Sequence, residues 1–231
     1  MIRTSDEASV RTVTIDRPDR RNALRPTDLT TLRTAVEDAD RPVTYLHGAG
    51  DAFCAGADLD VVADLDDPEA FARRGQRTMS ALTDAETVVV CGVDGAARGG
   101  GVELALAADV RVATPAATFA EPGVSLGLFG AWGGTVRLPR VMGEGNALDF
   151  SLSGRVLDAD AALRTGLVSR VIDDPRAVAD EIATGKPDAL RAIKSRVRDR
   201  RGDDAQERAE AAAFAELVRA HAGDIAAGRD R

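Results

Sequence analysis

The sequence predicts an α/β protein that ends in a helical region. Short β-branched, apolar runs alternate with helical patterns over the first half of the chain, and helical patterns follow one another in the second half. The 231 residues suffice for one domain with a sizeable core. No run of about 18 apolar residues occurs, so we expect no membrane-spanning helix.

The composition argues against several classes of partner. Hydrophobic residues make up 44% and charged residues 29% of the chain, as in ordinary globular proteins. A formal net charge of −8 argues against nucleic-acid binding. Because the N-terminus shows no apolar signal segment, we expect a cytoplasmic protein without a membrane partner. Cys54 and Cys91 are expected to be buried, reduced thiols, and two histidines offer little for a metal site.

The expected elements follow from apolar spacing and from turn residues. Strands are expected at residues 10–15, 42–47, 87–93, 109–113 and from 117 onward. Helices are expected from residue 26 and over 68–84, 102–108, 143–152, 158–165, 175–184, 187–200 and 203–227. The acidic segment 58–67 is expected to be irregular and exposed, and the glycine-rich segment 123–134 to pack against the core or a ligand. We assign residues 1–185 to a core domain and residues 186–231 to a helical oligomerisation region.

The residues that carry chemistry gather at residues 94–109, which contain a glycine turn. Gly99, Gly100 and Gly101 stand between an expected strand and an expected helix, where backbone N–H groups are free to bind a developing negative charge. Glu103, in the first helical turn, is the one ionisable side chain placed to act there. The alternative is a tight turn in which Glu103 only caps the helix. A phosphate loop fits poorly, because no Gly-Lys-Ser/Thr follows.

A second corner, residues 54–57, also follows an expected strand and precedes a helical turn. Its small residues suit either close packing or a backbone donor, the N–H of Ala57. An oxyanion hole needs such donors aimed at one point, with a base beside them. The candidates for such a site are therefore Glu103, the N–H groups of the glycine turn and, if this corner is more than close packing, the N–H of Ala57.

Four stretches of the chain, and a fifth that fits them, stand in a particular order and spacing. They are residues 17–24 (RPDRRNAL), 53–59 (FCAGADL), 95–109 and 127–143, and then 159–169. Together they resemble the crotonase (enoyl-CoA hydratase/isomerase) superfamily over residues 8–200. Each stretch alone is a weak signal, and the specificity comes from their combination.

The resemblance implies a crotonase-like spiral of ββα turns whose C-terminal helical region assembles homotrimers or homohexamers. It implies a lyase or isomerase of fatty acid metabolism that binds an acyl-CoA thioester, needs no separate cofactor or metal, and stabilises a thioester enolate. Matched by motif, the N–H groups of Ala57 and Gly100 form the oxyanion hole and Glu103 is the acid/base. The expected substrate-binding residues are Ala55, Gly56, Asp58, Leu59, Gly99, Gly123, Phe129 and Trp132.

One position departs from the family pattern. Hydratases of the family place a second glutamate four residues after a phenylalanine, and here the position four residues after Phe119 holds Gly123. A single carboxylate suffices to move a proton between two carbons, so this departure favours isomerisation over hydration. Glu121 is an alternative second acid, but Pro122 is expected to direct it away from the site. Gly123 also leaves room for a bulkier acyl group.

Several alternatives remain at the level of the sequence. Arg20, Arg21 and Arg25 are candidates either for binding the phosphates of coenzyme A or for solvated side chains on a turn. Phe129 and Trp132 belong either to an acyl pocket or to the core. The alternative functions are a catalytically weak CoA- or RNA-binding protein of the same fold, and an acyl-CoA hydrolase or decarboxylase on that fold.

Overall fold

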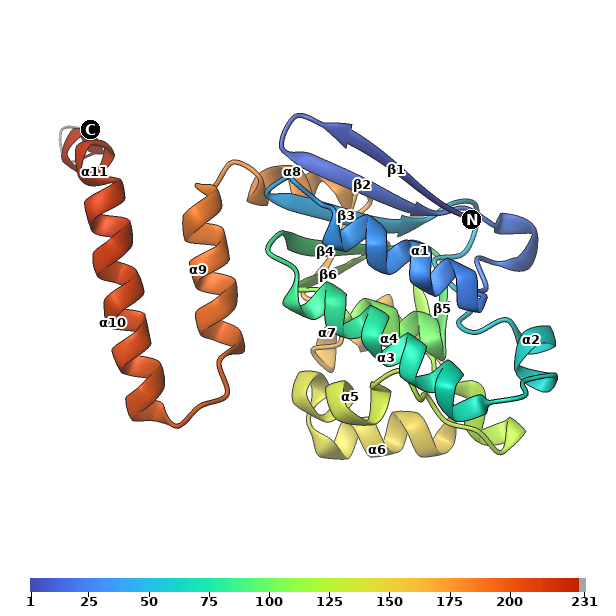
Figure 1. Cartoon of the computed structure of the whole chain (residues 1–231). Helices are drawn as coiled ribbons and strands as arrows, with labels where there is room; N and C mark the ends of the chain where they lie inside the picture. Colours follow the sequence, from blue (N-terminus) through green and yellow to red (C-terminus); the bar gives the residue numbers. More distant parts are fainter. Residues whose placement is uncertain (229–231) are drawn as a thin grey trace. The chain divides into compact units, whose positions relative to one another are not determined.

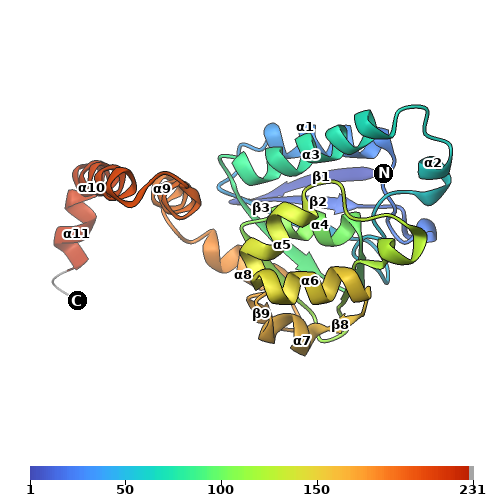
Figure 2. The same ribbon diagram turned by 90° about the horizontal axis from the view of Figure 1, so that it is seen from below.

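The chain folds as two compact units in the computed structural model, which describes residues 1–228 (Figure 1 and Figure 2). The first unit, Met1–Ala183, contains both sheets and every predicted site residue. The second unit begins at Thr184 and is helical. No helix within residues 1–228 combines the length and the apolar character that crossing a bilayer requires.

The main sheet of the first unit has six strands in the order β1-β2-β3-β4-β6-β9. Neighbouring strands are parallel except β1 and β2, which are antiparallel. The strands are β1 (Ile2–Glu7), β2 (Val10–Ile15), β3 (Val43–Gly48), β4 (Val88–Val93), β6 (Val110–Ala113) and β9 (Arg170–Val171). All of β4 is buried, as expected of a central parallel strand with an unbroken apolar sequence. The sequence does not predict β1, because every residue of β1 after Ile2 is exposed and only its pairing with β2 makes it a strand.

A second sheet of three short strands supports the glycine turn. β5 (Ala96–Arg98) runs parallel to β7 (Thr118–Ala120), and β7 is antiparallel to β8 (Leu157–Asp158). β5 lies between β4 and the helix α4 (Gly100–Ala107), so the turn follows β5 rather than the strand that the sequence predicts. The Ala-Ala-Arg sequence of β5 has no β-branched residue and therefore carries no strand signal.

Helices pack on the main sheet and on one another. α1 (Pro26–Glu37) and α3 (Pro68–Asp84) lie side by side in both views, and the Thr78 hydroxyl donates to the Leu29 carbonyl between them at 3.0 Å (Figure 1 and Figure 2). The bounds of α3 are those that the sequence predicts. α4 is apolar on all sides apart from Glu103, and it is buried from Gly101 to its end. The core therefore surrounds α4, and the one charged residue of α4 is enclosed with it.

The shorter helices of the first unit show where the prediction succeeds and where it is wrong. They are α2 (Leu59–Ala63), α5 (Gly134–Met142), α6 (Glu144–Ser153), α7 (Ala159–Arg164) and α8 (Arg176–Ile182), with 3-10 helices η1 (Pro18–Arg20) and η2 (Pro122–Leu126). The helices expected over 143–152, 158–165 and 175–184 are confirmed as α6, α7 and α8. α5 is unexpected because Gly133, Gly134 and Pro139 all indicate a break. The segment 58–67 is not irregular throughout, since it contains α2.

The second unit has no core of its own among the residues described. It consists of α9 (Pro187–Arg198), α10 (Asp203–Ala220) and α11 (Ala222–Gly228), and none of their described residues is buried. The single helix expected over 203–227 is interrupted at His221. The Nε2 of His221 lies 2.8 Å from the carboxylate of Asp188, which ties the break to α9.

Candidate functional site

The glycine turn has a backbone geometry that only glycine adopts readily. Gly99 has φ 48° and ψ −116°, outside the regions open to residues with a side chain. The N–H of Gly99 donates to the Ala120 carbonyl at 3.0 Å, and its own carbonyl accepts from Val102 and Glu103. Gly100 then starts α4, so its N–H lies at the positive end of the helix dipole. Within residues 1–228 no acceptor is recorded for this N–H.

The second predicted corner, residues 54–57, is held by a parallel β-bridge between Leu24 and Ala57. Leu24 donates to the Gly56 carbonyl at 2.8 Å, and the N–H of Asp58 donates back to Leu24 at 3.0 Å. In such a parallel bridge the middle residue, Ala57, turns its own N–H to the opposite side. No acceptor is recorded for it in the described chain.

The two corners are adjacent in space. A Cβ placed on Gly56 would lie 2.8 Å from the nitrogen of Gly100 and 2.6 Å from the Arg98 carbonyl oxygen. Gly56 therefore has to be glycine for the chain segments to approach this closely. The approach brings two unbonded backbone donors, those of Ala57 and Gly100, into one small region of the molecule.

A cavity of about 250 Å³ lies over these corners. Its walls include the predicted residues Ala55, Ala57, Leu59, Gly99, Gly100, Glu103, Gly123, Phe129 and Trp132. Gly56 and Asp58 are the predicted residues that do not line it. Apart from its two glutamates, Glu103 and Glu121, the side chains on its walls are apolar, which suits an acyl group.

Asp58 has a structural position rather than a place on the cavity. Its carboxylate accepts from the Arg17 guanidinium at 2.6 Å and from the N–H of Asp60 at the start of α2. Arg17 holds the pKa of Asp58 below its usual range. The side chain thus fixes the chain next to Ala57, and the expected exposure of segment 58–67 is wrong at its first residue, which is buried.

Glu103 is buried with its carboxylate in a fixed orientation. Its Oε1 accepts from the N–H of Trp132 at 2.7 Å and from the N–H of Gly134 at 2.6 Å. Burial raises the pKa of Glu103 to about 7, although these N–H groups and Arg137 favour the ionised form. A carboxyl group with this pKa can both accept and donate a proton near neutral pH.

The loop over Glu103 leaves no room for side chains at two of its glycines. A Cβ on Gly130 would lie 2.8 Å from the Glu103 carboxyl carbon, and one on Gly134 would lie 2.9 Å from Oε1. Both glycines let the backbone close directly over the carboxylate. The glycine-rich segment that the sequence expects to pack against a ligand or the core therefore packs first on Glu103.

Trp132 anchors this loop to the rest of the site. Its indole is 3% exposed, meets the Phe71 ring edge-on at a centroid distance of 5.8 Å, and lies on Gly75 of α3 and Gly100 of α4. Phe129 of the same loop is 72% exposed. Trp132 therefore belongs to the core and to the cavity wall at once, whereas Phe129 is a wall residue open to solvent.

Glu121 lies on the cavity, although the sequence predicts that Pro122 directs it away from the site. It is 5% exposed, it lines the cavity together with Glu103, and its Oε1 is buried with no hydrogen-bond partner among the described residues. Burial and the charge of Glu103 raise the pKa of Glu121 to about 8. Pro122 starts η2 one residue later without turning Glu121 away from the cavity. At Gly123, in contrast, a Cβ would lie 2.9 Å from the Leu128 carbonyl oxygen, so this position faces the loop backbone.

A second, larger cavity of about 520 Å³ borders the first. Both cavities share Glu121, Leu128, Phe129 and Gly130 as wall residues. The other walls come from η2, α5 and α6 and are mostly apolar: Val124, Gly134, Thr135, Leu138, Pro139, Glu144, Ala147, Leu148, Ser151 and Leu152. Glu121 thus stands where the two cavities meet.

Two of the arginines considered for phosphate binding are paired with carboxylates. Arg20 pairs with Asp60, and Arg25 donates to Asp28 at 2.8 Å. These pairs raise the pKa values of both guanidinium groups. Arg21 follows η1 in the left-handed conformation with φ 50° and is exposed.

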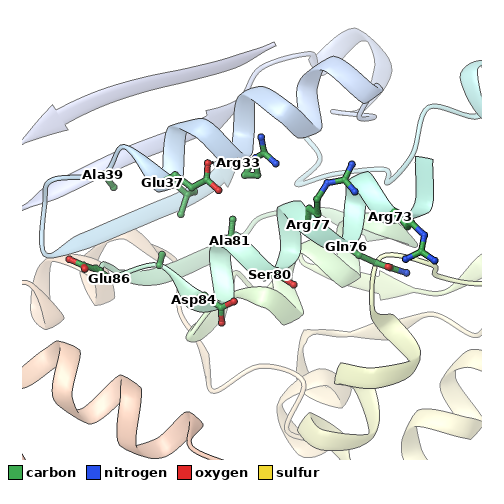
Figure 3. A pocket seen from close by; sticks show the side chains of 12 residues that line it. Arg33, Glu37, Ala39, Arg73, Gln76, Arg77, Ser80, Ala81, Asp84 and Glu86 are labelled. Carbon is green, nitrogen blue, oxygen red and sulfur yellow. Dashed lines mark ion pairs between the residues drawn. The ribbon is translucent and has the colours of Figure 1, made fainter. Parts of the chain in front are cut away.

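A separate groove of about 730 Å³ runs between α1 and α3 (Figure 3). Figure 3 shows a mixture of basic and acidic side chains along it, among them Arg33, Arg77, Glu37 and Asp84. None of the predicted site residues lines this groove. The described residues also contain no cluster of histidine, cysteine and carboxylate side chains that could hold a metal ion.

Comparison with known proteins places this chain and its fold in a family. The sequence profile described as enoyl-CoA hydratase/isomerase matches residues 5–223. A probable enoyl-CoA hydratase of Mycobacterium tuberculosis is 40% identical over 82% of this chain and 76% of its own. A crotonyl-CoA hydratase of Syntrophomonas wolfei is 38% identical over 68% of this chain and 64% of its own. The crystal structure of a putative enoyl-CoA hydratase from Streptomyces coelicolor superposes with a TM-score of 0.93 at 29% identity, covering 99% of this chain and 91% of that one.

These similarities show that the first unit has the crotonase fold, as the sequence predicts. The chain belongs to the enoyl-CoA hydratase/isomerase family. It is thus an enzyme of the class that the motif resemblance implies.

Proposed function

We propose that this enzyme acts on the carbon–carbon double bond of an enoyl-CoA thioester and stabilises a thioester enolate during the reaction. The observation that carries the proposal is the pair of unbonded N–H groups of Ala57 and Gly100 beside the buried carboxylate of Glu103. In this proposal the thioester oxygen accepts hydrogen bonds from both N–H groups. The acyl carbons then lie in the apolar cavity in front of Glu103.

The two donors supply the electrostatic part of the catalysis. Charge moves onto the thioester oxygen as the enolate forms, and both N–H groups are already in place to receive it. Gly100 adds the positive end of the α4 dipole. Each oxyanion donor contributes about 10²–10³ in rate in known enzymes, and the apolar walls keep that contribution high by excluding water.

Glu103 supplies the proton transfer. With a pKa of about 7 it is close to half ionised at neutral pH, so it is less strongly ionised than its place at a helix N-terminus suggests. Its Oε1 is occupied by the N–H groups of Trp132 and Gly134, which hold the carboxylate in one orientation. The thioester carbonyl takes up the electron pair, and the reaction therefore needs no separate cofactor.

A pair of substrates tests the proposal. Purified enzyme is assayed with crotonyl-CoA for hydration and with a 3-enoyl-CoA for double-bond migration, each with the Glu103→Gln variant in parallel. We expect turnover of at least one thioester and a loss of about 10²-fold or more in the variant. Hydrolysis to free coenzyme A without either reaction, or full activity of Glu103→Gln, would contradict it.

A further inference from the structure

Among the described residues, the carboxyl group of Glu121 lies buried in the cavity wall without the hydrogen bonds that a buried structural residue normally makes. It is buried on the wall that it shares with Glu103, and its Oε1 finds no hydrogen-bond partner among the described residues. Leaving a buried polar atom unpaired costs free energy, so such groups are rare unless they have a functional partner. No ion pair with Glu121 is recorded in residues 1–228.

We propose that Glu121 is a second catalytic residue of the enzyme, which donates a proton to the substrate carbon next to the thioester while Glu103 withdraws one from water. The inference rests on the proposed function, because it needs an enoyl thioester in the cavity. It assigns this role to Glu121 and not to residue 123, whose side-chain direction is blocked by the Leu128 backbone.

The surroundings of the two carboxyl groups decide which of them carries the charge. Glu103 receives two N–H donors, and Arg137 of α5 also favours its ionised form. Glu121 receives none on Oε1, faces the charge of Glu103, and shares the second cavity with Glu144 of α6. When the pair holds one proton, that proton therefore resides on Glu121. Glu103 is then the base and Glu121 the acid.

The reaction balances with these two groups and one water molecule. Glu103 takes a proton from water as the water oxygen bonds to the β-carbon of a 2-enoyl thioester, and the double-bond electrons move to the thioester oxygen. The enolate is held by the N–H groups of Ala57 and Gly100. Glu121 then gives its proton to the α-carbon, the carbonyl reforms, and a proton passes from Glu103 to Glu121 to restore the starting pair. One water has been added and nothing else is consumed.

With Glu121 as the acid, the cavity holds the two carboxyl groups that hydration needs, although residue 123 is glycine. A single carboxylate would have to serve both carbons of the double bond, whereas two carboxyl groups on one cavity divide the two proton transfers. Glu121 thus replaces the second glutamate from a position two residues earlier in the chain. The enzyme is then expected to hydrate 2-enoyl thioesters, in place of the isomerisation that Gly123 alone favours.

The test compares Glu121→Gln, Glu103→Gln and a control, Glu86→Gln, which changes an exposed glutamate in the separate groove. Hydration of crotonyl-CoA is measured from about pH 5 to pH 10. In the wild type, kcat/KM falls on the alkaline side as Glu121 loses its proton. Glu121→Gln should lower kcat about 10²-fold or more with little change in KM, and remove the alkaline limb from what activity remains. The control should match the wild type.

A second measurement distinguishes proton transfer by Glu121 from a merely structural role. It follows the exchange of the α-hydrogen of butyryl-CoA with deuterated water. In this proposal Glu121 is the group next to that carbon, so exchange above about pH 8 should survive in Glu103→Gln and be lost in Glu121→Gln. Full hydration by Glu121→Gln, or an alkaline limb that persists in it, would overturn the role of Glu121 while leaving the proposed function intact. If the wild type converts neither crotonyl-CoA nor a 3-enoyl-CoA, both proposals fail together.

Discussion

Glu103 is held in place by a backbone that touches it at van der Waals distance. Gly130 and Gly134 lie so close to its carboxyl group that neither position has space for a methyl group. The orientation of the carboxylate therefore depends on the two glycines as well as on the hydrogen bonds from Trp132 and Gly134. A small change in the loop should act on catalysis before it acts on the fold.

Gly130→Ala tests this dependence. The new methyl group pushes the Glu103 carboxyl group aside, and a displacement of about 1 Å can cost about 10²-fold in rate. We expect kcat to fall by about that factor while the far-ultraviolet circular dichroism spectrum stays unchanged. Gly145→Ala is the matched control, since nothing lies within 4 Å of its new methyl group. Equal activity of both variants would show that the loop yields without moving Glu103.

The raised pKa values of Glu103 and Glu121 make stability depend on pH. Both carboxyl groups bind their protons more tightly in the folded than in the unfolded chain, so the two groups carry more protons in the folded chain between about pH 4.5 and pH 8. Their contribution to the free energy of unfolding therefore falls as pH rises through that range. Glu121→Gln removes one of the two contributions, and urea unfolding at pH 5 and at pH 8 should differ less than for the wild type. A larger difference in the variant would contradict the raised pKa.

The helices α3 and α4 are joined through Trp132 to the glycine-rich loop that packs on Glu103. The indole packs on Gly75 and Gly100, and the side-chain amide of Gln76 donates to the Ala131 carbonyl at 2.9 Å. One side chain thus fixes the loop that orients Glu103 and covers the start of α4. We therefore expect changes at Trp132 to affect both activity and stability.

The Trp132→Ala substitution should lower both the stability and the activity of the enzyme. Removing a buried tryptophan lowers the free energy of unfolding by about 3–5 kcal/mol, and release of the loop should also reduce kcat. Phe129→Ala in the same loop should change the free energy of unfolding by less than about 0.5 kcal/mol, because that ring is already exposed. Chemical denaturation of the three proteins measures the difference. Similar losses for the two variants would mean that Trp132 is not the anchor.

Elements with strong local patterns are those that the sequence predicts. α3 has its apolar spacing, an Asp67 cap and a proline at its start, and its bounds are confirmed. β5 and α5 escape prediction, because β5 has no β-branched residue and α5 begins among glycines. Glu121 is misjudged for a different reason: its direction depends on tertiary packing around η2, which no local pattern records. The two backbone corners can be proposed from the sequence because their small residues and their resemblance to the family motifs are visible there.

At the scale of the whole molecule, the described helices of the second unit leave apolar residues exposed. Ile193 and Val197 of α9 and Phe214 of α10 are all exposed, and none of the described residues of these helices is buried. A unit this small without a core is not expected to be stable alone. Association with further copies of the chain would bury these side chains, in agreement with the trimer or hexamer that the family resemblance implies.

Multi-angle light scattering tests the assembly. At micromolar concentration and moderate salt we expect a mass three or six times that of the chain, since closed symmetry is the rule for oligomers. Replacing two exposed apolar residues, Ile193→Asp with Phe214→Asp, should shift the mass toward the single chain. Val156→Asp is the control, an exposed apolar position in the first unit. A wild-type monomer would contradict the expected assembly.

A crystal structure of the enzyme with a bound acyl-CoA would show which groups bind the thioester oxygen. We predict that this oxygen lies about 2.7–3.1 Å from both the Ala57 and the Gly100 nitrogen. We also predict that the acyl carbons lie between Glu103 and Glu121. A thioester oxygen bound elsewhere, with both N–H groups still unbonded and the cavity intact, would contradict this prediction.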